Sequence, residues 1–296
     1  MSVTAVIVNY NSGDWLARCL RSVLSLPEMD RVVVVDNASQ DDSVARIKSL
    51  LTEHESRLEL IQNVDNRGFA AANNQVLQGL LNSAASANDY ALLLNPDCEM
   101  KAGVLPAMLT HFEQQESMGM AGCVINNEDG SIQATCRRHF PTPKTALIRM
   151  LQLHRLRLKS LPDFDLGKQA LPDNLQFVEA ISGAFMLVRL SAMQEVGLLD
   201  EGYFMHCEDL DWCKRFHNKN WKIGFVPEVS VIHAKGVSSN SRPVRVLWTL
   251  HRGMLRFFDK FYYQQYPFYI RWSVKSGVYL SFLGRAGLAY VRRFLT

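Results

Sequence analysis

The feature that most constrains the fold is an alternation between continuous apolar runs and segments with helical apolar spacing. The chain begins with the run "VTAVIVNYN" (residues 3–11), which is typical of a buried parallel strand. The next segment, "GDWLARCLRSVLSL", repeats apolar residues at intervals near 3.6, which predicts an amphipathic helix. The same order returns in "RVVVVD", "DDSVARIKSLLTEH", "LELIQNVDNRGFAAANNQVLQGLL" and "YALLLNPD". This alternation predicts an α/β fold with a mostly parallel sheet flanked by helices.

Polar residues gather where the predicted strands end. Successive strand ends carry Asn9 and Asn11, Asp36 and Asn37, Asn66 and Arg67, and Asn95 and Asp97. A single Asp after a strand is usually a helix cap, whereas four such ends in succession favour a shared site. In open α/β sheets, ligands bind outside the carboxyl ends of the strands, so we expect the site at that edge.

The composition restricts where the protein works. With 296 residues and a hydrophobic fraction of 48%, the chain can build one large domain or two small ones. Its six cysteines include no C-x-x-C pair, which favours a reducing compartment over a disulfide framework or a zinc knuckle. We see no secretory signal and no spanning segment, so we expect a cytoplasmic protein. A net charge of +3 is too small by itself to indicate nucleic-acid binding.

The stretch "HCEDLDWCKR" (residues 206–215) places three acids within four positions. Asp211 has Arg215 four residues on, at the spacing of an ion pair on one helix face, so we expect Asp211 to be structural. Glu208 and Asp209 have no local cation. Acids in the first turn of a helix often serve the free backbone N–H groups and the helix dipole, and that interpretation competes with a catalytic one.

Two later segments interrupt the simple alternation. Residues 137–177 are basic and rich in proline, which indicates an excursion from the core, with a helix between flexible flanks. "FVEAISGAFMLVRL" then returns to strand-like sequence, with Gly183 where a ligand or backbone can approach closely. "WKIGFVPEVSVIHAKG" is typical of a strand pair that ends at His233.

The character of the chain changes near residue 242. Ten basic residues face one acid, Asp259, from there to the C-terminus, and aromatic residues lie between them. This pattern suits a helix at a membrane surface. It also suits nucleic-acid binding or a helical lid packed on the core, and the pattern does not decide between these.

Several nucleotide and hydrolase motifs are absent from the sequence. There is no G-x-G-x-x-G after the first strand, no G-x-x-x-x-G-K-[ST] and no G-x-S-x-G. Instead, "VIVNYN", "VVVVDNASQDDS", "DNRGFAAANN", "LLLNPD" and "YFMHCEDLDWCKR" occur in the order and spacing that resemble a family 2 glycosyltransferase with a GT-A fold. The combination of "NRGFAAANN", "NPD" and "EDLD" is similar to the rhamnosyltransferase-like branch. The resemblance covers residues 1–240 and leaves residues 241–296 as a basic, aromatic helical appendage, for which the membrane surface is one of the alternatives above.

The resemblance implies roles for the residues already singled out. Asn9, Asn11, Asp36, Asn37 and Arg67 match the nucleotide-binding strand ends, with Asp36 on the base or ribose. Asp97 in "NPD" matches the metal motif and would hold Mg²⁺ or Mn²⁺ against the diphosphate, and His233 matches a histidine that completes the metal site in some members. Asn95 stands where the family carries the first Asp of that motif. Because an amide oxygen is a poorer ligand than a carboxylate, we expect weaker metal binding.

The implied reaction is an inverting sugar transfer. Asp209 matches the base that deprotonates the acceptor hydroxyl, and Glu208 would orient the acceptor or the base. The branch implies L-rhamnose from dTDP-rhamnose as donor, or a UDP-sugar, and a glycan or polyprenyl-diphosphate-linked acceptor in cell-surface polysaccharide assembly. The tail would hold the enzyme at the cytoplasmic face of the inner membrane, with no nucleic-acid partner. Two alternatives remain: a catalytically weak nucleotide-sugar-binding or membrane scaffold protein, and a sugar nucleotidyltransferase, although "NYNSGDW" lacks the nearby Lys that the latter would need.

Overall fold

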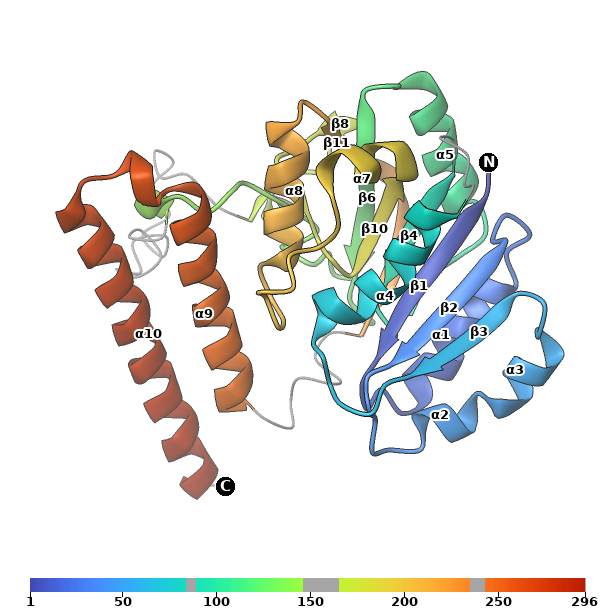
Figure 1. The fold of residues 1–296 in the computed structure, drawn as a ribbon, viewed down its shortest axis with the longest axis horizontal. Coiled ribbons are helices and arrows are strands. Elements are labelled where there is room, and N and C mark those ends of the chain that lie inside the picture. The colour runs from blue at the N-terminus through green and yellow to red at the C-terminus, as the bar shows by residue number, and fades with distance from the viewer. Residues whose placement is uncertain (84–88, 146–164, 235–242, 296) are drawn as a thin grey trace.

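A twisted sheet organises most of the chain (Figure 1), and the computed structural model describes residues 1–83, 89–145, 165–234 and 243–295. The strand order is β3-β2-β1-β4-β10-β6-β11-β5, with β8 paired to β11. The strands are β1 Val3–Asn9, β2 Arg31–Asp36, β3 Leu58–Gln62, β4 Tyr90–Leu94, β5 Cys98–Glu99, β6 Met118–Asn126, β8 Gln176–Phe177, β10 Phe185–Arg189 and β11 Lys222–His233. Strands β3, β2, β1 and β4 are parallel, as are β6 and β11, whereas β10 runs antiparallel between β4 and β6. The predicted α/β class is confirmed.

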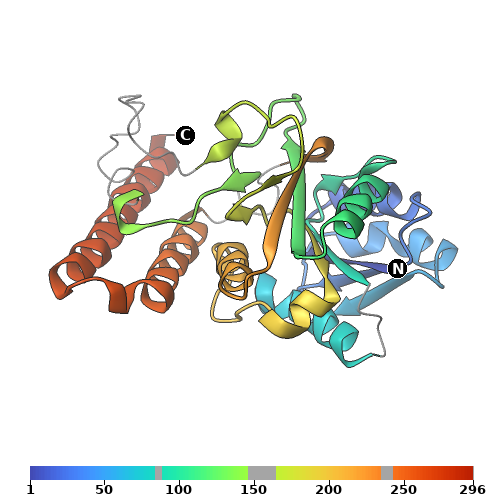
Figure 2. The ribbon, with the colours of Figure 1, turned by 90° about the horizontal axis from the view of Figure 1, so that it is seen from above.

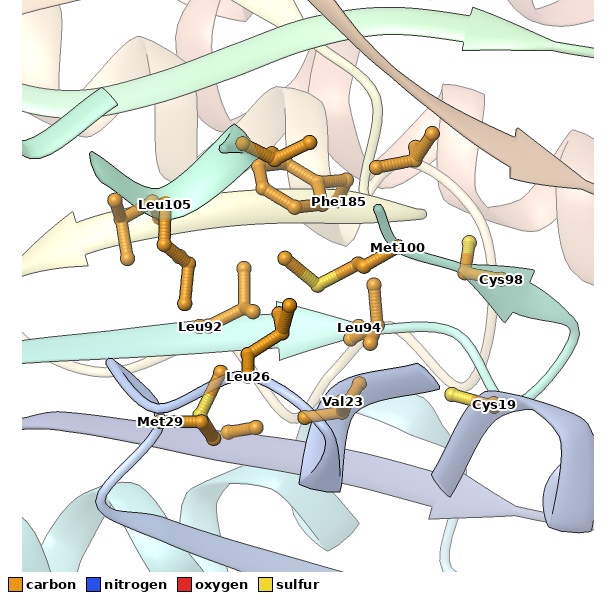
Figure 3. Packing of buried hydrophobic residues seen from close by; sticks show 14 of the residues in the cluster. Cys19, Val23, Leu26, Met29, Leu92, Leu94, Cys98, Met100, Leu105 and Phe185 are labelled. Carbon is orange, nitrogen blue, oxygen red and sulfur yellow. The ribbon is translucent and has the colours of Figure 1, made fainter. Parts of the chain in front are cut away.

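Helices cover both faces of the sheet, and each face has its own hydrophobic core. The helices are α1 Asp14–Leu24, α2 Ser43–Arg46, α3 Lys48–Glu53, α4 Phe69–Asn82, α5 Val104–Gln114, α7 Leu190–Val196 and α8 Glu208–Asn218. Helices α1, α3 and α5 pack on one face, and α4, α7 and α8 pack on the other. Strand β2 serves both, because Val32 and Val34 point into the first core and Val33 and Val35 into the second. Figure 3 shows the first core, where Val23, Leu26 and Met29 lie against Leu92 and Leu94 of β4.

Two predicted elements differ in detail. The helix expected in "DDSVARIKSLLTEH" is divided into α2 and α3 at Ile47, and the break leaves both Ile47 and Leu50 buried. The strand pair expected after Trp221 is the single long strand β11, which carries a register shift between Val226 and Ser230. Pro227 lies between these two residues. Because proline has no N–H to donate, it interrupts the ladder of hydrogen bonds at this point.

The region expected to leave the core is described in part. Residues 146–164, where a helix was expected, lie outside the described residues. On either side of them the chain forms β7 Arg137–Arg138, the short helix η2 Leu166–Lys168 and β9 Ala180–Ile181. Strands β7 and β9 pair with each other in a second, two-stranded sheet. This small sheet brings the basic segment back against α8, which matters for the site below.

The C-terminal part forms two helices joined by a short turn. Helix α9 spans Pro243–Phe261, η3 spans Tyr263–Gln265 and α10 spans Phe268–Leu295. Figures 1 and 2 show α9 and α10 side by side at one end of the molecule, with α9 nearer to α8. The second hydrophobic core includes Phe257 and Phe258 of α9 and Tyr262, which directly follows that helix. Within the described ranges, no helix combines the length and apolar character needed to cross a membrane.

Candidate active site

The polar residues predicted at the strand ends meet at one edge of the sheet. The register places Asn9 beside Asp36 across β1 and β2, and it places Leu94, just before Asn95, beside Phe185 of the antiparallel strand β10. The start of β10 therefore lies at the same edge as the ends of the parallel strands. This geometry brings the "ISGAF" turn, which contains Gly183, next to the candidate metal and catalytic residues.

The first group of site residues organises the loop after β2. Asn9 is fully buried, and its amide donates to Asp36 at 2.7 Å and to Ser43 at 2.9 Å. The other Asp36 oxygen accepts the backbone N–H of Ser39 at 3.2 Å, so both carboxylate oxygens are engaged. Asn9 Oδ1 is buried without a hydrogen-bond partner among the described residues. Such an orphaned acceptor suits a site that a ligand completes.

The backbone around this group is strained. Asn11 and Ala38 adopt positive φ angles of 53° and 64°. Asn11 stabilises the loop from both sides, because its N–H donates to Ser39 and its Oδ1 accepts the Gln40 N–H at 2.7 Å. Non-glycine residues in this region cost about 1–3 kcal/mol and gather at functional sites.

Asn37 fixes the turn that follows β3. Its amide nitrogen donates to Asn66 Oδ1 at 3.2 Å and to the Gly68 carbonyl at 3.1 Å, and its oxygen accepts the Asn63 amide at 3.0 Å and the Arg67 N–H at 3.3 Å. The Asn37 side chain therefore holds the turn after β3 in place against the end of β2. The exposed side chain of Arg67 has no ion-pair partner among the described residues, which leaves its charge available to a ligand.

That turn is locked to the loop before α8. Gly68 has a φ of 85°, and a Cβ atom there would lie 2.5 Å from the carbonyl oxygen of Phe204. The Phe69 N–H donates to the same carbonyl at 2.8 Å. The "NRGF" and "YFMHCED" motifs are thus in direct contact, and glycine is required where they cross.

The candidate metal residues also meet. His233 Nε2 lies 3.1 Å from Asp97 Oδ1 and 3.2 Å from the Asn95 side-chain amide. On its other side, His233 Nδ1 lies 3.2 Å from Gln133 Oε1, and the Gln133 amide donates to the His233 carbonyl at 2.9 Å. An Nδ1–H bond to Gln133 leaves the Nε2 lone pair facing Asp97, the usual arrangement of a metal-ligating histidine.

This donor set fits a divalent cation that takes its remaining ligands from a diphosphate. Asp97 offers a carboxylate and His233 an imidazole, and a rotated Asn95 side chain would offer its amide oxygen. The described residues hold no group of three or more His, Cys, Asp or Glu side chains that could enclose a metal. Two or three protein ligands plus phosphate oxygens are the ordinary set for such an ion.

Asp209 is nearly buried and has a cation partner after all. Arg138 of β7 donates to Asp209 Oδ2, which also accepts the Gly183 N–H at 3.1 Å, and Asp209 Oδ1 accepts the Leu210 N–H at 2.8 Å. As expected, Asp209 has no cation nearby in the sequence, and the fold supplies one from 71 residues away. Burial alone would raise the pKa of Asp209, but the charge and hydrogen bond of Arg138, with the two backbone donors, hold that pKa below its usual value.

Glu208 has the opposite environment. Its side chain is buried, and its Oε2 has no hydrogen-bond partner within the described part of the chain. Burial, and then repulsion from Asp209, raises the pKa of Glu208. The preceding residue, Cys207, is the N-cap of α8 in a left-handed conformation, and no side chain caps the helix. The interpretation that first-turn acids serve free backbone N–H groups therefore holds for Asp209, which accepts the Leu210 N–H, but it does not account for the unpartnered Oε2 of Glu208.

Asp211 is structural, as predicted. It accepts a hydrogen bond from Arg215 Nε at 2.7 Å and one from the Tyr203 hydroxyl at 3.2 Å. Its carboxylate is also 2.7 Å from Lys260 Nζ of α9. The pair with Arg215 follows from helical spacing. The contact of Asp211 with Lys260, like that of Asp209 with Arg138, joins segments far apart in the chain, so no local spacing in the sequence indicates it.

Comparisons with known proteins agree with this geometry. Residues 4–191 match the family model described as glycosyl transferase family 2. N-acetylglucosaminyl-diphospho-decaprenol L-rhamnosyltransferase of Mycobacterium tuberculosis (strain ATCC 25618 / H37Rv) is 26% identical over 93% of this chain and 90% of its own length. Rhamnosyltransferase WbbL of Escherichia coli (strain K12) is 27% identical over 78% of this chain and 83% of its own.

Solved structures of low sequence identity show the same fold. The structure of GalNAc-T7 with UDP, GalNAc and Mn²⁺ is 16% identical with a TM-score of 0.58 over 79% of this chain, which spans only 44% of that longer chain. The mannosyltransferase PcManGT from Pyrobaculum calidifontis, in complex with GDP-Man and Mn²⁺, is 14% identical with a TM-score of 0.55 over 97% of this chain and 75% of its own. Since the family model covers more than half of the chain, the protein belongs to glycosyl transferase family 2 and is a glycosyltransferase with a GT-A fold.

Proposed function

We propose that the enzyme transfers L-rhamnose from dTDP-rhamnose to a lipid-linked acceptor, with inversion at the anomeric carbon. The observation that carries the donor is the likeness, across most of the chain, to two relatives whose names specify rhamnosyl transfer. The first relative's name also specifies a diphospho-decaprenol acceptor, which supports a polyprenyl-diphosphate-linked acceptor here. A UDP-sugar donor and a glycan acceptor are the alternatives.

In this proposal the strand ends bind the nucleotide. Asn9 and Asp36 hold the loop on which the base and ribose rest, Asn11 and Asn37 shape its borders, and the Arg67 side chain meets the phosphates. The engaged hydrogen bonds of Asp36 and Asn37 support a role in shaping the site at least as much as one in contacting the ligand. A neutral amide oxygen at Asn9 remains for a donor group on the nucleotide.

Asp97 and His233 would hold Mg²⁺ or Mn²⁺, with Asn95 as a weak third ligand. The mixed carboxylate and imidazole pair favours Mn²⁺, because Mg²⁺ prefers oxygen ligands. The cation would offset the negative charge that develops on the leaving diphosphate. The chain's own contribution is to place that diphosphate at the edge of the sheet where Asp209 also lies.

Asp209 would accept the proton of the acceptor hydroxyl as the new bond forms. Its lowered pKa keeps it a carboxylate at neutral pH, and three donors hold it in place. Glu208 is protonated over more of the pH range because its pKa is raised, so it can donate a hydrogen bond to an acceptor or donor oxygen. One displacement by this route inverts the configuration.

The exposed face of α10 supports attachment to a membrane surface. Phe268, Trp272 and Leu283 are 79%, 72% and 62% exposed, and Tyr269, Tyr279 and Leu280 extend the same face. Several basic residues of the tail already have partners within the chain, among them Arg256, Lys260, Arg271 and Lys275. The apolar face therefore carries this proposal more than the net charge does, and the enzyme would lie on the cytoplasmic face of the inner membrane.

A panel of nucleotide sugars tests the donor. Thermal stabilisation is measured with and without Mn²⁺ for dTDP-rhamnose, UDP-sugars and GDP-mannose. A ligand at 100 times its Kd adds about 2.7 kcal/mol, so the correct donor stands out. We expect dTDP-rhamnose to stabilise most and Mn²⁺ to increase its effect. A larger shift with a UDP-sugar would assign that donor instead, and no shift with any of them would contradict nucleotide-sugar binding.

A further inference from the structure

Arg138 occupies a position that the roles above leave unassigned. It lies on β7, buried at 8% exposure, and it comes from the basic segment rather than from a strand end of the main sheet. Its Nη2 donates both to the Ile181 carbonyl of β9 and to Asp209 Oδ2. The guanidinium is thus anchored to the small second sheet while it contacts the acid of α8.

The contact leaves Asp209 little freedom. Arg138 and the Gly183 N–H share one carboxylate oxygen, and the Leu210 N–H takes the other. The Gly183 backbone also approaches this side chain closely, because a Cβ atom added there would lie 3.2 Å from Asp209 Cβ. Neighbouring Ala184 accepts the Asn95 N–H at 3.0 Å, so this short turn joins the candidate base to the candidate metal residues.

The charges near Asp209 explain why a cation is needed there. Helix α8 contributes Glu208 and the thiol of Cys213, and the N-cap contributes the thiol of Cys207; burial raises the pKa of each, and none of them supplies a positive charge to Asp209. Arg138 of β7 is the cation that faces Asp209 among the described residues. Without that cation, burial and Glu208 would favour the protonated form of Asp209, which cannot take a proton from a hydroxyl.

We propose that Arg138 is a positioning residue that keeps Asp209 ionised and aimed at the acceptor hydroxyl. This inference rests on the proposed role of Asp209 as base. Arginine suits the task because its terminal Nη2 carries two N–H groups, which donate to a carbonyl and a carboxylate at once, and because the guanidinium stays charged when buried. The proton passes from the acceptor hydroxyl to Asp209, and Arg138 neither gains nor loses one.

The adjacent arginine supplies a matched control. Arg137 is also buried, but it donates to Gln176 Oε1 at 2.8 Å and to the carbonyls of Gln169 and Ala170. Its guanidinium lies over the Phe225 ring. Arg137 carries the same charge as Arg138, lies on the same strand and is also buried, but it contacts neutral groups instead of a carboxylate.

The test is the pH profile of sugar transfer by wild type, Arg138→Gln, Arg138→Lys and Arg137→Gln, with donor affinity measured by calorimetry. Activity that needs ionised Asp209 falls as pH drops through its pKa. We expect wild type to hold its activity into mildly acidic pH. Arg138→Gln should lose about 10²-fold or more in kcat at neutral pH, recover as pH rises, and bind donor normally. Arg138→Lys should keep the wild-type profile with partial activity, and Arg137→Gln should resemble wild type.

An Arg138→Gln enzyme with a wild-type pH profile would overturn the proposal, whether its activity is high or uniformly low. If that variant does not fold, Arg138→Lys and Arg137→Lys decide, because equal kcat values in the two would contradict a special role for Arg138. Failure of wild type to transfer any sugar would instead contradict the proposed function. The two failures are therefore distinguishable.

Discussion

Lys260 of α9 reaches the fully buried carboxylate of Asp211 on α8, the helix of the candidate base, with 2.7 Å between Nζ and Oδ2. The same ammonium lies 2.7 Å from Asp200, which Arg256 also contacts. Nearby, a Cβ atom at Gly253 would lie 2.8 Å from the His206 carbonyl. Helix α9 is therefore docked on the loop and helix that carry Glu208 and Asp209. The division into residues 1–240 and 241–296 stays a prediction, and these contacts argue that the first part depends on α9.

Lys260→Met should destabilise the fold by about 1–2 kcal/mol. Removing Lys260 leaves the buried carboxylate of Asp211 with one donor fewer. The loss is limited because Arg215 and Tyr203 still donate to Asp211 and because Lys260 is partly exposed. The matched control is Lys275→Met, whose partner Asp259 is exposed and which should cost less than about 0.5 kcal/mol. Urea denaturation of both variants measures this, and equal losses would argue against a structural role for the Lys260 contact.

Docking of α9 should weaken in acid. Burial alone would raise the pKa of Asp200, but hydrogen bonds from Arg256 and Lys260 outweigh it and hold that pKa well below its usual value. A carboxylate with a depressed folded pKa stabilises the fold above its unfolded pKa of about 3.9, and that contribution is lost as pH falls through the folded value. We expect the protection factors of the α9 amides against hydrogen exchange to fall below about pH 4 in wild type. In Asp200→Asn the protection of α9 should be low at neutral pH already, and unchanged protection there would contradict this.

Asp209→Asn should lower kcat by about 10²- to 10⁴-fold while donor binding stays near wild type. The amide keeps the shape of the side chain but cannot take a proton. Single-turnover transfer together with calorimetry of the donor separates the two effects. A variant with near wild-type kcat would place the base elsewhere.

Glu208→Gln should cost less than Asp209→Asn at neutral pH. Because the pKa of Glu208 is raised, glutamine resembles the protonated form of the residue and keeps a hydrogen-bond donor. The comparison is made in the same transfer assay. If Glu208→Gln is the more damaging variant, the orphaned Oε2 of Glu208 marks it as the base, and Asp209 becomes the orienting acid.

Asn95→Asp should tighten Mn²⁺ binding, and Asp97→Ala should abolish it. The first change supplies a carboxylate beside His233 and Asp97, and the second removes the one carboxylate of the pair. Electron paramagnetic resonance of Mn²⁺ titrated with dTDP measures both without any turnover. His233→Ala should give a smaller loss than Asp97→Ala. Unchanged Mn²⁺ binding in Asp97→Ala would exclude that residue as a ligand.

Flotation with liposomes tests the tail. The triple variant Phe268→Ser, Trp272→Ser and Leu283→Ser should stay at the bottom of the gradient, whereas wild type should float with anionic lipid. A control that removes exposed apolar residues elsewhere, Val64→Ser with Phe177→Ser, should float like wild type. Because the apolar face carries the binding, moderate salt should reduce flotation only in part. Sedimentation of wild type with anionic lipid at low salt would contradict membrane attachment, and steeply salt-dependent binding to RNA or DNA would favour the nucleic-acid alternative.

Much of the placement of the candidate site could be predicted from the sequence, because parallel strands end at one edge. The periodicity placed Asn9, Asp36 and Asn95 at strand ends, and sheet topology then brought them together. The supporting contacts could not be predicted in this way. Gln133 meets His233 across 100 residues and Arg138 meets Asp209 across 71, so no local spacing reveals them. The distinction between Glu208 and Asp209 depends on such neighbours, and it appeared only in the fold.

The most direct measurement follows the sugar itself. Wild-type enzyme is incubated with Mn²⁺, labelled dTDP-rhamnose and a polyprenyl-diphosphate-linked acceptor, and NMR determines the anomeric configuration of the product. We expect transfer with inverted configuration and release of dTDP, and we expect Asp209→Asn to bind the donor without transferring it. Donor binding by wild type without transfer to any acceptor would favour the scaffold alternative, and a product with retained configuration would contradict the single displacement.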